Sequence, residues 1–217
     1  MATWFTSDFH FGHEKEFLWK PRGFTDWKGH AERIIENYNS VIKSDDIVYI
    51  LGDCMLKNDE YGLECLKQLN GRKYLAIGNH DSNRRIELYD RENIFKDIRY
   101  GYRFEASKIS FWAQHYPAMM GNYKDKHPTI CLAGHTHSPD PYQTMDNGTY
   151  NVALDAHKCY PVSLAQIIED VIAYRKTHPV IEYEDRSPYC KYCKFYTTCA
   201  ARPGHELPCP GYKPNEN

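Results

Sequence analysis

The sequence predicts an α/β domain in which a layered sheet is covered by helices on both faces. Three observations support this class: short apolar runs bounded by turn residues, amphipathic segments between them, and a composition of the globular type. The 217 residues are 41% hydrophobic and 26% charged, which excludes a disordered or collagen-like chain. Strands that alternate with helices are typical of α/β architecture.

The first part of the chain supplies three expected strands and two expected helices. The β-prone residues 3–6 form the opening strand. Residues 30–43 carry apolar side chains at helical spacing. The apolar run 47–51 that follows is typical of a strand buried on both faces. A second helix is expected over 60–69, ahead of a strand at 73–77.

Three more strands and one helix are expected farther along the chain. The strands lie at 108–113, 129–133 and 150–154, each short and bounded by turn residues. Ser163 and Gln166 form a capping box that begins the last helix. Its inward-facing apolar side chains are Ile167, Ile168, Val171 and Ile172.

The composition indicates two domains, 1–176 and 177–217, because apolar periodicity fades in the second, which holds four of the eight cysteines. No apolar run approaches the roughly 20 residues of a transmembrane helix, so no membrane partner is expected. Asp8 interrupts the stretch where a signal peptide needs apolar residues, which predicts a cytoplasmic protein. The net charge of −2 provides no global positive field for nucleic acid.

Five of the expected strands end on residue types that bind metals. Ligands of α/β sheets bind beyond the carboxyl ends of the strands, so we expect these ends to converge. Asp8 and His10 are two residues apart, and an extended backbone would project both to the same side. Glycines at 52, 78 and 134 let the backbone approach the site closely. The candidate set is Asp8, His10, Asp53, Asn79, His80, Asp81, His115, His135 and His137.

In their order along the chain, these segments resemble the calcineurin-like metallophosphoesterase superfamily. The motifs that carry the resemblance are Asp8-x-His10, Gly52-Asp53, Gly78-Asn79-His80-Asp81, His115 and Gly134-His135-x-His137. The resemblance is to small bacterial and phage-type members, and it covers about residues 3–172. It implies a layered sheet sandwich flanked by helices, to which this chain adds a small Cys-rich C-terminal element.

The resemblance also implies a centre of two divalent ions. Asp8, His10 and His137 would bind one ion, and Asn79, His115 and His135 the other. Asp53 would bridge them together with a hydroxide that acts as nucleophile. His80 would be the general acid near the leaving group, with Asp81 orienting its ring. The mixed N and O donors suit Mn, Fe, Zn, Ni or Co.

One departure from the family is the segment after Asp53, which lacks the arginine that many members place there. We therefore assign no anchoring role to this loop. His13 and Arg22 are candidates for contacting substrate, and the pair Arg84-Arg85 could grip a phosphate. The alternatives are a backbone-bonded histidine and solvated arginines. Specificity is expected to lie in loops 20–29, 83–99 and 117–127.

The charge of such a centre favours phosphate chemistry. Two divalent ions, two aspartates and a hydroxide leave about one positive charge for an anionic substrate. The expected function is hydrolysis of phosphate esters, as a phosphodiesterase or phosphatase, on a phosphorylated small molecule or nucleotide. A metal-dependent nuclease, which would make nucleic acid the partner, is the alternative within this class. A non-catalytic metal-dependent binding module is the alternative from another class.

The tail contains its own candidate metal site. One CxxC pair is followed by two more cysteines, which gives enough thiols for a four-thiolate site. Such a site would cross-link a segment that is too short to form its own hydrophobic core. Structural Zn is the first interpretation and an iron–sulfur cluster the second. Unligated thiols or disulfides remain open, and His205 could replace one ligand. The tail ligands are Cys190, Cys193, Cys199 and Cys209.

Overall fold

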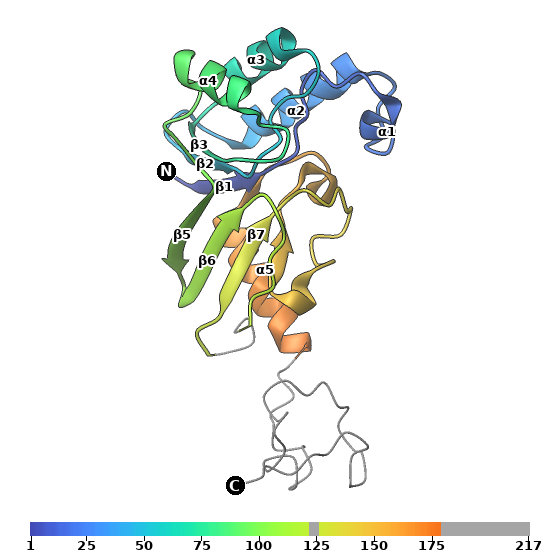
Figure 1. Cartoon of the computed structure of the whole chain (residues 1–217). Coiled ribbons are helices and arrows are strands. Elements are labelled where there is room, and N and C mark those ends of the chain that lie inside the picture. Colours follow the sequence, from blue (N-terminus) through green and yellow to red (C-terminus); the bar gives the residue numbers. More distant parts are fainter. Residues whose placement is uncertain (122–125, 179–217) are drawn as a thin grey trace, which may run out of the picture. The chain divides into compact units, whose positions relative to one another are not determined.

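The computed structural model describes residues 1–121 and 126–178 and confirms the α/β class (Figure 1). Its first compact unit is Met1–Thr177. The predicted tail ligands Cys190, Cys193, Cys199 and Cys209 lie outside the described residues, so their metal site stays a prediction. The structure below is that of the first unit.

Five strands form the first sheet, in the order β4-β3-β2-β1-β9. Four of them are parallel neighbours, and the short β9 is antiparallel to β1. The strands are β1 (Thr3–Thr6), β2 (Ile47–Ile50), β3 (Arg72–Ala76), β4 (Asp97–Arg99) and β9 (Val162–Ser163). Parallel neighbours need crossover connections. The helices of these crossovers are α1 (Glu16–Trp19), α2 (Trp27–Val41), α3 (Asp59–Lys67) and α4 (Asn83–Arg91).

A second sheet of four strands has the order β5-β6-β7-β8. Its first pair is an antiparallel hairpin, and the other pairs are parallel. The strands are β5 (Gly101–Ala106), β6 (Ile109–Gln114), β7 (Thr129–Ala133) and β8 (Thr149–Asn151). The remaining elements are the 3-10 helices η1 (Met145–Asn147) and η2 (Leu154–His157) and the helix α5 (Leu164–Thr177).

The first sheet buries an apolar core on each face. Val48 and Ile50 face one core, where α2 contributes Ile34 and Tyr38. Residues of opposite orientation on the same sheet, such as Phe5, face the second core together with the second sheet and α5. The result is a sandwich of two sheets flanked by helices, as the sequence predicted.

The structure corrects several sequence predictions about elements. Helix α2 begins at Trp27 rather than at residue 30, because the Asp26 carboxylate accepts hydrogen bonds from the first-turn amides and caps it. Segment 83–99 is not a loop, since it contains α4 and β4. Ile172, expected to face inward, is 39% exposed. The Ser163 half of the capping box is confirmed, with Gln166 N donating to Ser163 Oγ at 3.1 Å, but the Gln166 side chain donates to Asp170 instead.

The other sequence predictions for the first unit concern membranes and cysteines. Among the described residues, no helix has the length and apolar character needed to cross a bilayer. Cys54, Cys65, Cys131 and Cys159 are buried free thiols. They pack as small apolar side chains.

Candidate metal centre

The loops that follow β1 and β2 are joined by backbone hydrogen bonds. Asp8 N donates to Gly52 O at 3.1 Å, and His10 N donates to Asp53 O at 3.0 Å. In the second sheet, Gly134 N donates to His115 O at 3.0 Å and so joins the loops after β6 and β7. The carboxyl ends of the strands therefore converge, as their order in the sequence predicted.

The backbone at the converging side chains differs from the extended conformation that the spacing suggested. Asp8 has φ +62° and His10 has φ +49°, both in the left-handed region. Asp53, His135 and His137 also have positive φ. Each such residue costs on the order of 1–3 kcal/mol, and such strain clusters at functional sites. The strands end before the candidate ligands, and tight turns, not a continued strand, orient them.

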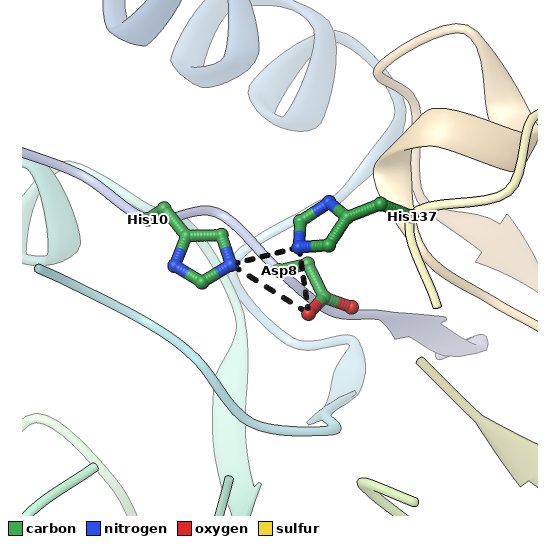
Figure 2. Close-up of side chains that lie close together, drawn as sticks. All are labelled: Asp8, His10 and His137. Atoms are coloured by element: carbon green, nitrogen blue, oxygen red, sulfur yellow. Dashed lines mark hydrogen bonds and ion pairs between the residues drawn. The ribbon is translucent and has the colours of Figure 1, made fainter. Parts of the chain in front are cut away.

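The first cluster consists of Asp8, His10 and His137, whose side chains point toward one another in Figure 2. His10 Nε2 lies 3.1 Å from His137 Nε2. These two nitrogens lie 3.7 and 3.8 Å from Asp8 Oδ1. Ligand atoms about 2.1 Å from one ion at tetrahedral angles are roughly 3.4 Å apart. The spacing of this cluster fits a single ion.

The second cluster consists of Asn79, His115 and His135. His115 Nε2 lies 2.8 Å from Asn79 Oδ1 and 3.2 Å from His135 Nδ1. His115 is buried, whereas Asn79 and His135 are exposed. The cluster therefore has a closed floor and an open edge that solvent or substrate can reach.

One carboxylate oxygen lies between the two clusters. Asp53 Oδ2 is 3.6 Å from His10 Nε2 and 3.6 Å from His115 Nε2. The other oxygen of Asp53 accepts a hydrogen bond from His80 N at 2.8 Å, which fixes the carboxylate. One Asp53 oxygen therefore lies equally close to a histidine nitrogen of each cluster.

The side-chain atoms of the clusters fit cations because they present lone pairs, rather than hydrogen-bond donors, to one another. His115 Nδ1 donates to the Leu51 carbonyl at 2.8 Å, so its Nε2 carries a lone pair toward the cluster. Asp8 Oδ1 is buried, and no hydrogen-bond donor reaches it within the part of the chain that the structure describes. An unpaired buried carboxylate oxygen is costly unless a cation neutralises it. Both clusters therefore have the chemistry of metal sites.

The protonation states agree with this interpretation. Burial, with the nearby His137 and Arg22, lowers the pKa of His10 well below its usual value, so its imidazole is neutral. Burial likewise lowers the pKa of His135, assisted by His115. Burial raises the pKa of Asp8, although His137 and His115 oppose the shift. Neutral imidazoles are the form that binds a divalent ion.

A buried network supports His137 from behind. Its Nδ1 donates to Asp155 Oδ2 at 3.0 Å, which leaves Nε2 for the first cluster. Arg22 donates to both oxygens of Asp155, at 2.9 and 2.7 Å. Burial acts to raise the pKa of Asp155, but its bonds to His137 and Arg22 outweigh burial and hold the pKa well below the usual value. Burial acts to lower the pKa of His137, but its hydrogen bond to Asp155 outweighs burial and raises the pKa above the usual value.

This network changes the interpretation of Arg22 and adds a residue that the sequence analysis missed. The Arg22 side chain is 2% exposed and also donates to Asp8 O at 2.9 Å. Its guanidinium is engaged within the protein, where it orients Asp155 and does not face solvent. Asp155 was missed because it contacts His137 and Arg22 only through the fold. The signal available in the sequence was an acidic residue in the apolar segment 151–155.

Asp81 holds the loops together instead of orienting the ring of His80. Its carboxylate accepts hydrogen bonds from the amides of Asp53 and Gly78, at 2.9 and 3.0 Å. Tyr89 Oη donates to it at 3.1 Å. Among the hydrogen bonds of the described residues, none joins Asp81 to the His80 ring, so the expected pairing is absent there. The four-residue turn Gly78–Asp81, closed by a hydrogen bond from Asp81 N to Gly78 O at 3.2 Å, places the carboxylate beside the Asp53 loop.

His80 and His13 lie at the edge of the centre. His80 Nε2 is 3.9 Å from Asp53 Oδ2, and its side chain is 39% exposed. His13 is buried, its ring centroid lies 6.4 Å from that of His10, and its Nδ1 accepts a hydrogen bond from Lys15 N. His13 therefore has the backbone-bonded role that the sequence analysis left open, while the His80 ring is accessible from solvent.

Two glycines permit the close approach of the loops. A Cβ on Gly52, which has φ +90°, would lie 2.6 Å from His115 Nδ1. A Cβ on Gly134 would overlap Ser7 Oγ and Asp8 Oδ2. Gly134 is followed by His135, whose N donates to Asp8 Oδ2 at 3.0 Å. This contact joins the loop after β7 to the loop after β1, and hence the two sheets, at the centre.

Comparison with known proteins agrees with this arrangement. Residues 1–151 match the family described as calcineurin-like phosphoesterase. The chain belongs to this family. It is a metal-dependent hydrolase of phosphoester bonds. The match covers every residue of the two clusters and ends before Asp155.

Individual relatives include phage and archaeal proteins. The Gene 66 protein of Mycobacterium phage L5 is 39% identical over 83 residues, which is 36% of this chain and 39% of that protein. The uncharacterized protein MJ1445 of Methanocaldococcus jannaschii is 27% identical over 172 residues, 75% of this chain and 87% of its own. The solved structure of AQ665, a protein of unknown function from Aquifex aeolicus, has TM-score 0.61 at 24% identity. The match covers 77% of this chain and 98% of the AQ665 chain, and it shows that the two share a fold.

Proposed function

We propose that this chain hydrolyses phosphodiesters of small or nucleotide-like molecules at a centre of two divalent ions. The observation that carries the proposal is the position of Asp53 Oδ2, 3.6 Å from a histidine nitrogen of each cluster. A single carboxylate oxygen at equal distance from two ligand sets favours a pair of ions over one ion. Asp8, His10 and His137 would hold the first, and Asn79, His115 and His135 the second.

The charge of the centre supports a diester over a monoester. Two divalent ions, Asp8, Asp53 and a hydroxide sum to about +1. A phosphodiester carries one negative charge and balances this centre, whereas a monoester dianion needs a further cation. Arg22, the buried arginine nearest the first cluster, is already neutralised by Asp155.

The protein residues have distinct tasks in this proposal. When bound, two divalent ions lower the pKa of water toward neutrality and stabilise charge on the phosphoryl oxygens. Asp155 and the Leu51 carbonyl fix the ring orientations of His137 and His115. His80 is half-exposed beside Asp53, where an imidazole can donate a proton to the departing oxygen near neutral pH.

The test starts from protein stripped of metal and then titrated with Mn²⁺. We expect hydrolysis of bis-p-nitrophenyl phosphate to appear only with added ion and to saturate at two ions per chain. The variant His80→Ala should slow turnover by roughly 10²–10⁴-fold, while elemental analysis still finds both ions. Lys108→Ala is the control, because Lys108 is exposed and precedes β6, at the end of that strand away from the centre.

Two outcomes would contradict the proposal. Saturation at one ion per chain would remove the two-ion centre. Loss of metal from the His80→Ala protein would show that His80 is a ligand and not the proton donor.

A further inference from the structure

An open hollow of about 410 Å³ lies beside the candidate centre. It is formed by the loop after β2 and the start of α4. A second hollow of about 640 Å³ shares Lys57, Asp59 and Arg84 with it and is otherwise lined by Glu14, Lys15, Asn58 and Glu60, so the excess of positive charge belongs to the first hollow. The residues that line the first hollow are Leu56, Lys57, Asp59, Ser82, Arg84 and Arg85. We call this set the basic hollow.

The basic hollow adjoins His80 through direct contacts. Arg85 Nη1 donates to His80 O at 2.6 Å, and Ser82 N donates to the same oxygen at 3.0 Å. On its other side, Leu56 N donates to Phe11 O at 2.9 Å, next in sequence to the ligand His10. The backbone of His80 therefore lies at the border between the candidate centre and this hollow.

The charge of the basic hollow is positive. Its one carboxylate, Asp59, pairs with Arg84 at 2.7 Å and with Arg85 at 2.8 Å. Three cations against one carboxylate leave an excess of two positive charges. Arg84 is 82% exposed, so most of its guanidinium faces solvent while Asp59 holds its orientation. Fixed guanidinium groups recognise phosphate oxygens with good geometry.

One backbone feature adds to this charge. Ser82 precedes α4 without a capping hydrogen bond from its side chain, so the amino end of the helix keeps its partial positive charge. Ser82 and Arg84, at this end of the helix, line the hollow.

We propose that the basic hollow binds a second phosphate, carried by the leaving alcohol of the substrate. This inference rests on the proposed function, because it uses the departure of the leaving group toward His80. The substrate class is then a phosphodiester whose leaving alcohol is itself phosphorylated, as in an oligonucleotide end or a phosphorylated dinucleotide. Lys57 and Arg84 contact the second phosphate, and Asp59 positions Arg84.

The experiment compares the Mn²⁺-loaded protein on three dinucleotides: TpT, its 5′-phosphorylated form and its 3′-phosphorylated form. We expect kcat/KM for one phosphorylated form to exceed that for TpT by about 10- to 100-fold, the effect of one or two charged hydrogen bonds. In Lys57→Ala and in Arg84→Ala this ratio should fall about tenfold. Lys96→Ala, an exposed lysine just before β4, is the matched control and should keep the ratio.

The failures of the inference and of the proposed function are distinguishable. If the protein hydrolyses bis-p-nitrophenyl phosphate but prefers neither phosphorylated dinucleotide to TpT, the second-phosphate site is wrong and the proposed function stands. Equal losses on TpT and on the phosphorylated form in the variants would also overturn the site. No hydrolysis of any diester with Mn²⁺ would overturn the proposed function itself.

Discussion

The two ligand clusters meet at Asp53 but are supported in different ways. In the first, His137 is held by the Asp155 carboxylate, which Arg22 binds in turn. In the second, His115 is held by the Leu51 carbonyl, a backbone group at the end of β2. One cluster thus depends on a pair of side chains, and the other on a backbone carbonyl that follows a strand of the other sheet.

The difference teaches which side chains can change without loss of a metal site. A carboxylate partner raises the basicity of a metal-bound histidine, and such partners typically change metal affinity by 10–100-fold. A backbone carbonyl cannot be removed by substitution. The first cluster is therefore the more sensitive of the two to point mutations behind its ligands, while the second is sensitive mainly at Asn79, His115 and His135.

The largest effect is expected where the clusters join. Asp53→Ala should remove the shared oxygen and lower kcat/KM for an aryl diester by at least about 10³-fold. Metal content after loading should fall below two ions per chain. Asp90→Ala, an exposed carboxylate on α4, is the control. A variant that keeps two ions and near-normal activity would show that Asp53 does not join the sites.

A smaller effect separates the clusters. Asp155→Asn removes the charge that holds His137, so we expect affinity for one ion to fall about 10–100-fold while affinity for the other is kept. Calorimetric titration of metal-free protein with Mn²⁺ measures both constants. Equal weakening of the two sites would contradict the difference in support.

The third effect is a loss of stability where the loop after β7 packs against the loop after β1. Gly134→Ala places a Cβ against Ser7 Oγ and Asp8 Oδ2, and overpacking of this kind costs about 1–3 kcal/mol of unfolding free energy. Urea unfolding of the metal-free protein measures the change. Gly121→Ala is the matched control, because a Cβ there meets no atom of the described residues within 4 Å. Equal stability of the two variants would mean that the loops are not closely packed at Gly134.

The smallest effect is a pH dependence behind the first cluster. His30 contacts Arg22, and burial together with that charge lowers the pKa of His30 to about 3. The unfolded chain protonates this histidine below its usual pKa of about 6.5, whereas the folded chain does not, so stability falls as pH falls. Between pH 7.5 and 6.0, His30 should account for about 0.8 kcal/mol of lost unfolding free energy.

His30→Gln should lack this contribution, and His127→Gln, at an exposed position, should retain it. Urea unfolding at the two pH values measures both. The same pH slope in His30→Gln as in the unaltered protein would show that His30 is not held neutral by burial.

The sequence predicted six of the nine strands that the structure describes, and the candidate metal ligands after them, because both predictions depend on local order; β4, β5 and β9 were missed. An apolar run such as 47–51 is a strand wherever it is buried, and its carboxyl end must point to the edge of the sheet where Asp53 lies. Helix α4 was missed because its mean hydropathy is low and only Tyr89 on it is buried. Its residues are mostly charged or polar, so the segment resembled a solvated loop.

What the sequence could not supply was contact between distant residues and the backbone of the turns. Arg22 and Asp155 are 133 positions apart, and only the fold brings them together. The spacing of Asp8 and His10 suggested an extended strand, but the turn that orients them depends on hydrogen bonds to Gly52 and Asp53. Ile172 was assigned inward from periodicity, yet α5 buries Ile167 and Val171, and Ile172 lies about 100° around the helix from Val171 and is 39% exposed.

The left-handed backbone at the candidate metal ligands lowers the stability of the fold in return for the positions of their side chains. His10, His135 and His137 occupy left-handed backbone conformations, which cost less energy for asparagine or glycine than for histidine. Such a replacement would relax the turn and remove an imidazole at the same time. We therefore expect descendants of this chain that abandon catalysis to drift toward those residues and to melt at higher temperature than the working enzyme in its metal-free form.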